Sequence, residues 1–249
     1  MTSSADAAVE VIGLRKDFGT KRALDEATFD VARGEIFGLL GPNGAGKTTT
    51  MRILLTLLKP TAGTARVAGY DVTSAPVPVR EQVGWVPQER AVDPLLTVME
   101  NMTFMGGMYH LAPRAARRRA ARLLEVAGLA GQANEVAREL SGGTRRKLEL
   151  AMSLVNVPAV LFLDEPTVGL DIGARRDLWA YVRQISRDGT TIVLTTHYLD
   201  EADSLCDRVA IIDRGRIQAT GTPAGLKTSY QASTLDDAFL AVTGQELAA

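Results

Sequence analysis

A glycine-rich segment, GPNGAGKTT at residues 41–49, carries the most recognisable chemistry in the sequence. It follows the apolar run IFGLL and precedes the helix-forming run TTMRILLTLL, which is the strand–loop–helix setting of a phosphate-binding loop. Its glycines permit backbone conformations that turn successive N–H groups toward anionic oxygens. Lys47 would reach the β- and γ-phosphates of a nucleotide, and the Thr48 hydroxyl would bind Mg²⁺. We expect a nucleoside triphosphate to be bound by Gly41, Pro42, Asn43, Gly44, Ala45, Gly46, Lys47, Thr48 and Thr49.

The loop itself leaves the class of protein open, because kinases, GTPases and motor ATPases share it. A glycine turn with an incidental lysine explains the segment less well, since that reading ignores the flanking strand and helix. Guanine specificity usually comes from an Asn-Lys-x-Asp tetrad, and the sequence has no Asn-Lys pair. The pattern therefore favours an adenine nucleotide.

Two adjacent carboxylates end the apolar run VLFLDEP at residues 160–166. Charged groups at the end of a buried strand are costly unless they meet a cation or a reacting water. Asp164 fits the role of a Mg²⁺ ligand that acts through a coordinated water. Glu165 fits the role of a base that polarises the attacking water. The alternative is that both side chains only cap the helix that follows.

A histidine, His197, follows the apolar run TIVLTT at residues 191–196. A lone histidine is usually structural. This one ends a strand that should neighbour the phosphate site, because ligands of α/β folds bind at the carboxyl ends of the strands. We therefore interpret His197 as a contact to the γ-phosphate.

A second helix start that suits an anion lies in RELSGGTRRKLEL, residues 138–150. A serine and two glycines interrupt a helix-forming run, and basic residues follow at once. Positive charge near a helix N-terminus opposes the helix dipole by about 0.3–1 kcal/mol per group. Glu149 could offset Arg145 at i+4 and Arg146 at i+3. The segment lies far along the chain from residues 41–49, so the anion that it would bind is not obvious from the sequence around it.

The elements that must position these residues indicate an α/β fold. Compact apolar runs suit a buried, mostly parallel sheet at 35–40, 159–163, 191–196 and 208–213. Two further runs suit an N-terminal antiparallel layer at 9–14 and 27–31. The sequence DRGRI, residues 213–217, predicts a glycine turn between two short strands.

The pattern becomes helical between about residues 89 and 156, where Ala, Arg, Leu and Met dominate. The clearest helix is predicted at 114–129. Its arginines Arg114, Arg118 and Arg122 share one face, which we interpret as a solvated polar face rather than a nucleic-acid patch. The chain then divides into an α/β core at 1–88 and 157–230, an inserted α-helical subdomain at 89–156, and a short C-terminal tail at 231–249.

Composition excludes several classes of protein. With 249 residues, 46% hydrophobic and 23% charged, the chain is an ordinary globular one, and its net charge of −1 gives no overall attraction to nucleic acid or acidic lipid. The longest stretch without charge is 14 residues, Leu150–Leu163, while a membrane span needs about 20 apolar residues. The first residues do not have the pattern of a secretory signal. The single cysteine, Cys206, is expected to be a buried small hydrophobe rather than a reactive thiol.

The order of these motifs resembles that of the ATP-binding cassette (ABC) ATPases. Six motifs occur in the family's order and span essentially the whole chain. They are the phosphate loop, PQ at 87–88, LSGG at 140–143, LFLDE at 161–165, GLD at 169–171 and TTH at 195–197. The resemblance implies a P-loop NTPase (RecA-like) core with an N-terminal antiparallel β layer and an inserted α-helical subdomain. It also implies that two ATPase domains meet head to tail and hold two ATP molecules, with Mg²⁺, between them.

The resemblance assigns further roles. Phe18 resembles the aromatic that stacks on adenine, with a core phenylalanine as the alternative. Gln88 resembles the glutamine that touches Mg²⁺ and the attacking water, and Asp171 resembles the aspartate that crosses the dimer interface. A second anion-binding helix start, which would hold the partner's ATP, is formed by Leu140, Ser141, Gly142 and Gly143. Hydrolysis would be carried by Lys47, Gln88, Glu165 and His197, and Mg²⁺ would be held by Thr48, Gln88 and Asp164.

The chain departs from the family pattern in three places. Thr144 replaces the glutamine that is common after LSGG, which should alter dimer contacts more than chemistry. VGLD at 168–171 replaces the more general SALD, a form associated with exporter-type members. Ile172 stands where proline is frequent.

Two C-terminal segments, GTPAGLK at 221–227 and STLDDAFLAVTG at 233–244, resemble the tail of bacterial cassette ATPases of the doxorubicin/daunorubicin export type. We therefore expect an ATPase subunit that powers export of drugs, antibiotics or other hydrophobic compounds by ATP-driven dimerisation. Its partners would be a second nucleotide-binding subunit, either a copy of this chain or a homologue, and separate transmembrane permease subunits, with no nucleic acid. Through the permease, the subunit would lie at the cytoplasmic face of the membrane. The alternatives are an importer subunit, a soluble cassette ATPase of translation or DNA repair, and a P-loop kinase. Proteins of the export type often continue beyond the point of Ala249, which leaves tail-based regulation open.

Overall fold

A mostly parallel sheet lies at the centre of the computed structural model, which describes residues 7–89 and 91–244. Within these residues the order of its six strands is β10–β9–β3–β8–β7–β6, and every neighbouring pair is parallel except β9 with β10. The strands are Ile36–Leu40 (β3), Val83–Val86 (β6), Val160–Asp164 (β7), Thr191–Thr196 (β8), Arg208–Asp213 (β9) and Arg216–Gly221 (β10). The predicted parallel sheet and the glycine turn at Gly215 are confirmed, whereas β6 was not predicted because it is short and contains a glycine.

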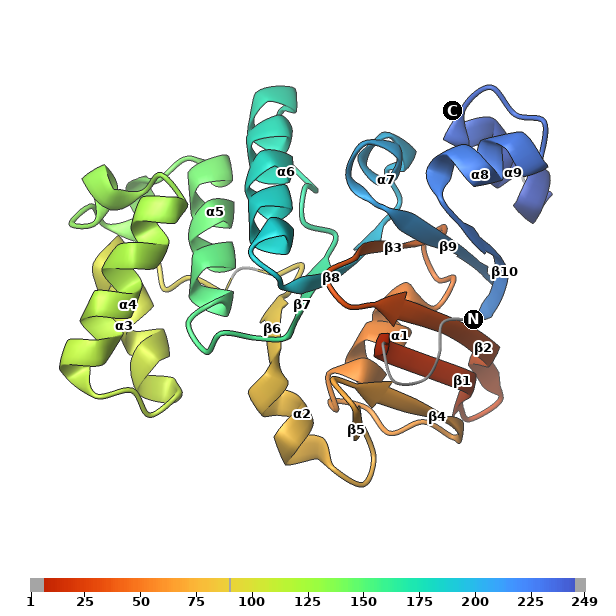
Figure 1. The fold of residues 1–249 in the computed structure, drawn as a ribbon, viewed down its shortest axis with the longest axis horizontal. Coiled ribbons are helices and arrows are strands. Elements are labelled where there is room, and N and C mark those ends of the chain that lie inside the picture. The colour runs from red at the N-terminus through yellow and green to blue at the C-terminus, as the bar shows by residue number, and fades with distance from the viewer. Residues whose placement is uncertain (1–6, 90, 245–249) are drawn as a thin grey trace.

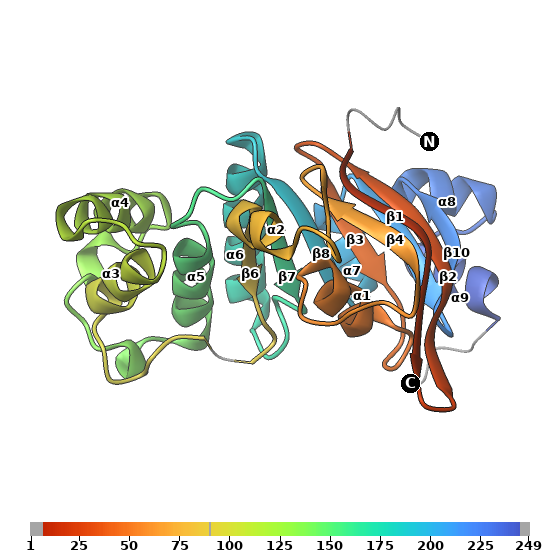
Figure 2. The ribbon, with the colours of Figure 1, turned by 90° about the horizontal axis from the view of Figure 1, so that it is seen from below.

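An antiparallel sheet covers one face of the central sheet (Figure 2). It has the order β2–β1–β4–β5 and consists of Ala7–Phe18 (β1), Lys21–Ala32 (β2), Ala62–Val67 (β4) and Tyr70–Asp71 (β5). The predicted N-terminal layer is therefore confirmed, and its first two strands are longer than expected. Strands β4 and β5 were missed because only two of their side chains, Ala65 and Val67, are fully buried.

Alternate residues of each central strand face different hydrophobic layers, as the two-residue period of a strand requires. In β3, Phe37 and Leu39 pack with the antiparallel sheet and α1, and the rings of Phe37 and Phe29 stack at 5.5 Å. Ile36 and Leu40 point to the opposite layer, which is built from helices. Burial of side chains of this size contributes about 1.5–3 kcal/mol each, so both layers hold the strand ends in place.

The helices flank the central sheet (Figure 1). They are Lys47–Leu54 (α1), Pro76–Gln82 (α2), Val98–Met108 (α3), Pro113–Val126 (α4), Gly142–Ser153 (α5), Ile172–Arg187 (α6), Leu199–Leu205 (α7), Pro223–Ser229 (α8) and Leu235–Thr243 (α9), with short 3₁₀ turns at Ala130–Gln132 (η1) and Ala137–Glu139 (η2). In residues 7–89 and 91–244 none of these helices has the length and apolar character to cross a bilayer.

Helices α3, α4 and α5 supply the regular elements of the described part of 89–156, as predicted. Figure 1 shows α3 and α4 at the end of the molecule farthest from β1 and β2, with α5 between them and α6. Helix α4 ends at Val126 rather than at residue 129, because Gly128 adopts a left-handed φ of +70°. Leu123 and Leu124 are buried and the arginines Arg114, Arg118 and Arg122 are exposed, in agreement with the predicted faces.

The cysteine prediction is also confirmed. Cys206 is buried, and burial raises the pKa of its thiol well above the usual value, which makes a reactive thiolate unfavourable. Cys206 directly follows α7, which ends at Leu205, and precedes β9.

A fully buried carboxylate, Glu201, joins α7 to α6. Its Oε1 accepts a hydrogen bond from Trp179 Nε1 at 3.0 Å. Burial raises the pKa of Glu201, against the smaller lowering effects of hydrogen bonds from Thr196, Trp179 and Thr167. The fold thus favours the protonated acid, which stabilises the protein at acidic pH, and this contribution is lost as the pH rises past the raised pKa.

We predict that Glu201→Gln makes stability less dependent on pH. Glutamine keeps an acceptor for Trp179 and has no charge to bury, so the free energy of unfolding should rise by on the order of 1 kcal/mol near pH 8 and change little near pH 5. Urea unfolding at the two pH values measures this difference. Glu125→Gln, at an exposed position of α4, is the control. An equal effect of Glu201→Gln at both pH values would contradict the role of burial.

Candidate functional site

The phosphate loop lies between β3 and α1 and packs against β9. Gly46 forms the N-cap of α1 with φ +116°, a conformation that other residues rarely adopt. A Cβ on Gly41 would lie 2.2 Å from the carbonyl oxygen of Ile212, so only glycine lets the loop approach that strand. The loop ends at the N-terminus of α1, where free N–H groups and the helix dipole favour an anion.

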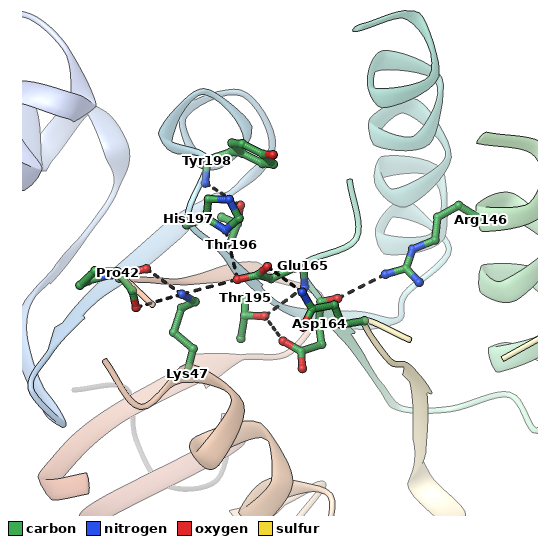
Figure 3. A network of polar contacts seen from close by, with 11 residues as sticks. Pro42, Lys47, Arg146, Asp164, Glu165, Thr195, Thr196, His197 and Tyr198 are labelled. Carbon is green, nitrogen blue, oxygen red and sulfur yellow. Dashed lines mark hydrogen bonds and ion pairs between the residues drawn. The ribbon is translucent and has the colours of Figure 1, made fainter. Parts of the chain in front are cut away.

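The amino group of Lys47 lies at the centre of this loop. Its Nζ donates hydrogen bonds to the carbonyl oxygens of Gly41 at 2.7 Å and Pro42 at 3.2 Å, and lies 3.6 Å from Glu165 Oε1 (Figure 3). Burial lowers the pKa of Lys47, and the carboxylate of Glu165 opposes that effect. The loop therefore places a buried cation beside a carboxylate, ready for an anionic ligand.

Glu165, the first residue after β7, has a strained backbone conformation. Its φ is +47°, a left-handed value that costs a residue with a side chain on the order of 1–3 kcal/mol. Its N–H donates to the carbonyl oxygen and to Oγ1 of Thr195, both at 3.1 Å. The neighbouring Asp164 is buried, and its Oδ1 accepts a hydrogen bond of 2.5 Å from Thr195 Oγ1. The next helix, α6, is capped by Asp171, so the alternative that Asp164 and Glu165 cap it is wrong.

Three predicted side chains converge on the carboxylate of Glu165, and Figure 3 shows two of them, Lys47 and His197. Gln88 Nε2 donates to Oε2 at 3.3 Å, and His197 Nδ1 lies 3.1 Å from Oε1, which Lys47 also approaches. Gln88 follows β6, Glu165 follows β7 and His197 follows β8, and these strands are neighbours in the sheet. The structure thus brings together the four residues expected to carry hydrolysis.

A cleft of about 450 Å³ opens in front of the phosphate loop. It is lined by Phe18, Lys21, Ala23, Pro42, Asn43, Gly44, Gly46, Lys47, Thr48, Thr49, Gln88 and Glu165. Phe18 is 49% exposed, so the alternative of a core phenylalanine is wrong. Lys16 Nζ lies 5.1 Å from its ring centre. Gly41 and Ala45, also predicted to touch the nucleotide, lie outside the lining and support the loop from behind.

The helix start at Ser141 is built as an N-cap. Ser141 Oγ accepts from the N–H of Thr144 at 3.1 Å and lies 2.8 Å from Thr144 Oγ1, so the departure at residue 144 places a second hydroxyl at this end of α5. A Cβ on Gly143 would lie 2.8 Å from the Cβ of Ala174, which shows how closely α5 packs on α6. Leu140 is buried. Residues Leu140–Gly143 do not line the described walls of the phosphate-loop cleft.

The basic residues that follow have partners within the chain. Arg146 pairs with Glu149 at 2.7 Å, as the i+3 spacing suggested, and Lys147 lies 3.5 Å from Asp177. The suggested Arg145–Glu149 pair is not formed, because Arg145 donates instead to the carbonyl oxygens of Ala137, Arg138 and Leu140. Each of these three basic side chains is therefore bound by carboxylate or carbonyl groups of the same chain.

Asp171 and Ile172 lie on the surface at the start of α6. Asp171 Oδ1 accepts from the N–H of Ala174 at 2.8 Å, so the side chain is an N-cap. Ile172, the third departure from the family pattern, is 71% exposed. An interface role of Asp171 stays a prediction.

Thr195 is a site residue that was not identified from the sequence. It was part of the motif TTH, but only His197 was assigned a role. The parallel register pairs Thr195 with Asp164, which brings its hydroxyl to both carboxylate-bearing residues. A hydroxyl at the end of an otherwise apolar strand was the available signal, since such a group needs a partner when it is buried.

Comparison with known proteins fits this geometry. Residues 24–168 match the family model described as ABC transporter. The daunorubicin resistance ATP-binding protein DrrA3 of Streptomyces coeruleorubidus is 47% identical over 93% of this chain and 73% of its own length. The Nod factor export ATP-binding protein I of Ralstonia nicotianae is 46% identical over 88% of this chain and 68% of its own. A dimeric ATP-binding cassette bound to ADP and Pi superposes with a TM-score of 0.75 at 26% identity, over 86% of this chain and 98% of that one.

The matched region contains the phosphate loop, Gln88, the Ser141 helix start and the carboxylates of β7. The predicted P-loop fold with an antiparallel layer and inserted helices agrees with these relatives as well as with the topology described above. The chain therefore belongs to the ABC transporter family and carries the family's ATP-binding ATPase domain.

Proposed function

We propose that this chain is the ATP-hydrolysing subunit of an ABC export complex for drugs, antibiotics or other hydrophobic compounds. The observation that carries the proposal is the convergence of Lys47, Gln88 and His197 on Glu165 at the mouth of a phosphate loop. The named relatives in drug resistance and Nod factor export support the direction of transport. The transported compound would be recognised by separate permease chains.

Oxygen ligands supply the proposed magnesium site. Thr48 offers a hydroxyl, Asp164 a carboxylate and Gln88 an amide oxygen, which is the donor chemistry that Mg²⁺ prefers. Bound Mg²⁺ would neutralise charge on the β- and γ-phosphates of ATP. Thr195 holds Asp164 in place through its 2.5 Å hydrogen bond.

Glu165 is the proposed base. Its carboxylate would accept a hydrogen bond from the attacking water, and Gln88 would fix that water from the other side. His197 holds Glu165 from the β8 side and would contact the γ-phosphate. Lys47 would move from the loop carbonyls to the β- and γ-phosphates, which offer it full charges in place of dipoles. Phe18 would stack on adenine at the exposed end of the cleft.

The complete site is proposed to form between two copies of the chain. The exposed helix start at Ser141 would bind the γ-phosphate of the partner's ATP, and Asp171 would cross the interface. Residues 89–156 would act as the unit that carries this helix start, joined to a core of 1–88 and 157–230 and followed by a tail of 231–249. The subunit would sit at the cytoplasmic face of the membrane through its permease partners, without nucleic acid.

We predict that Glu165→Gln slows ATP hydrolysis by about 10²–10⁴-fold, which is the usual contribution of a positioned base. ATP binding should persist, and the variant should accumulate as an ATP-bound dimer. Phosphate release and size-exclusion chromatography measure the two effects. Glu81→Gln, on the surface of α2, serves as the control. Normal hydrolysis by Glu165→Gln would mean that another group is the base.

Ser141→Arg is expected to abolish turnover while the isolated subunit still binds ATP. An arginine side chain would block the partner's nucleotide, whereas Ser141 does not line the subunit's own phosphate-loop cleft. Ser141→Ala separates this effect from the loss of the N-cap, which costs about 1 kcal/mol in either variant, and it should retain part of the turnover. Binding of a fluorescent ATP analogue to the monomer decides the matter: if binding is lost, the motif acts within its own chain.

Thr195→Val should lower kcat by about 10–100-fold. The change keeps the shape of the side chain but removes its hydrogen bonds to Asp164 and to the N–H of Glu165, and bonds to charged groups contribute about 1.5–3 kcal/mol, where about 1.4 kcal/mol is tenfold in rate. Thr191→Val, at the other end of β8, removes a bond to the N–H of Gly34 and is the control. Equal losses of kcat in both variants would argue for a general effect on folding.

A further inference from the structure

Arg146, in the second turn of α5, holds three carbonyl groups of two distant chain segments. Its guanidinium donates to the carbonyl oxygens of Pro87 at 2.8 Å, Pro166 at 2.9 Å and Asp164 at 3.2 Å. Figure 3 shows the side chain reaching from its helix to the end of β7. Asp164 and Pro166 are the two neighbours of Glu165, so this guanidinium fixes the backbone on both sides of the proposed base.

Glu149, one helical turn further along α5, completes the arrangement. Its Oε2 accepts from Arg146 Nη1 at 2.7 Å, and its Oε1 accepts from the N–H of Ala91 at 3.2 Å. Pro87 and Ala91 lie on either side of Gln88, so the Arg146–Glu149 pair holds this segment at both ends as well. The side chains of the pair are 10% and 4% exposed, which places both charges in a region of low dielectric.

The neighbouring basic residues of α5 do not contact the segments that flank Gln88 and Glu165. Arg145 bonds to the segment just before its own helix, and Lys147 meets Asp177 on the surface. Arg146 thus differs from both neighbours in joining the segments of Gln88 and Glu165, whose side chains are 3.3 Å apart. A planar guanidinium suits this task, because its donors lie in fixed directions.

We propose that Arg146 and Glu149 form a positioning pair, which sets Gln88 against Glu165 and connects both to the helix that begins at Ser141. The inference rests on the proposed ATPase function and deepens it. Any displacement of α5 by the partner's nucleotide would be passed by the buried Arg146 side chain to the backbone beside Gln88 and Glu165. The pair itself touches no reacting atom, and its effect on hydrolysis lies in how it sets Gln88 against Glu165.

A double-mutant cycle on the full chain tests this proposal. Arg146→Gln should lower kcat about 10-fold in the natural sequence but less than about 2-fold in a Gln88→Ala background, since residues that act through one another are not additive. The KM for ATP should stay within about 2-fold, because the phosphate loop is unchanged. Lys147→Gln, at the adjacent half-buried position that pairs with Asp177, should change neither constant.

Glu149→Gln is the second variant, because loss of one member of a buried pair can unfold a protein. It keeps an acceptor for the N–H of Ala91 and removes only the charge opposite Arg146, and it should show the same non-additivity with Gln88→Ala. If the kcat losses of the single variants multiply in both double variants while ATP binding is intact, the positioning role is overturned. The proposed function would still stand. An unmodified chain that binds ATP but hydrolyses none, alone or with a permease, would overturn both.

Discussion

The parallel pairing of β7 with β8 is the interaction on which the rest of the site depends. Its register sets Thr195 beside Asp164, and the threonine then bonds to the side chain of one acidic residue and the backbone of the next. These bonds offset the strain of the left-handed φ at Glu165. The order β3–β8–β7–β6 then places Lys47, His197, Glu165 and Gln88 in a row, because each follows one of four adjacent strands.

Much of this row could be predicted from the sequence, because its signals are local. Two patterns that span only a few residues predicted these roles. One is a glycine-rich loop between an apolar strand and a helix, and the other is a polar residue directly after a buried strand. Strand β6 escaped prediction because four residues with a central glycine give no clear period. Its sequence neighbour Gln88 was assigned only through the family resemblance.

Contacts between distant segments could not be predicted. The spacing of Arg146 and Glu149 indicated their pair, but not that the pair would bind backbone at residues 87, 91, 164 and 166. Those partners depend on how α5 packs against the ends of β6 and β7. The exposure of Phe18 was undecided for the same reason: an aromatic residue at the end of a strand can face inward or outward. In the fold it is exposed and lines the phosphate-loop cleft.

The close packing of Gly143 on Ala174 has a mechanical consequence. Among the described residues, one hydrophobic cluster runs from α3 and α4 through α5 and α6 to the sheet, so these helices share their core with the rest of the chain. Helices that meet through residues as small as Gly143 and Ala174 can slide past one another by small amounts, which is the shear type of domain motion rather than a hinge. In such a shear motion, α5 would stay packed on α6 throughout, and the apolar surface between the two helices would remain shielded from water.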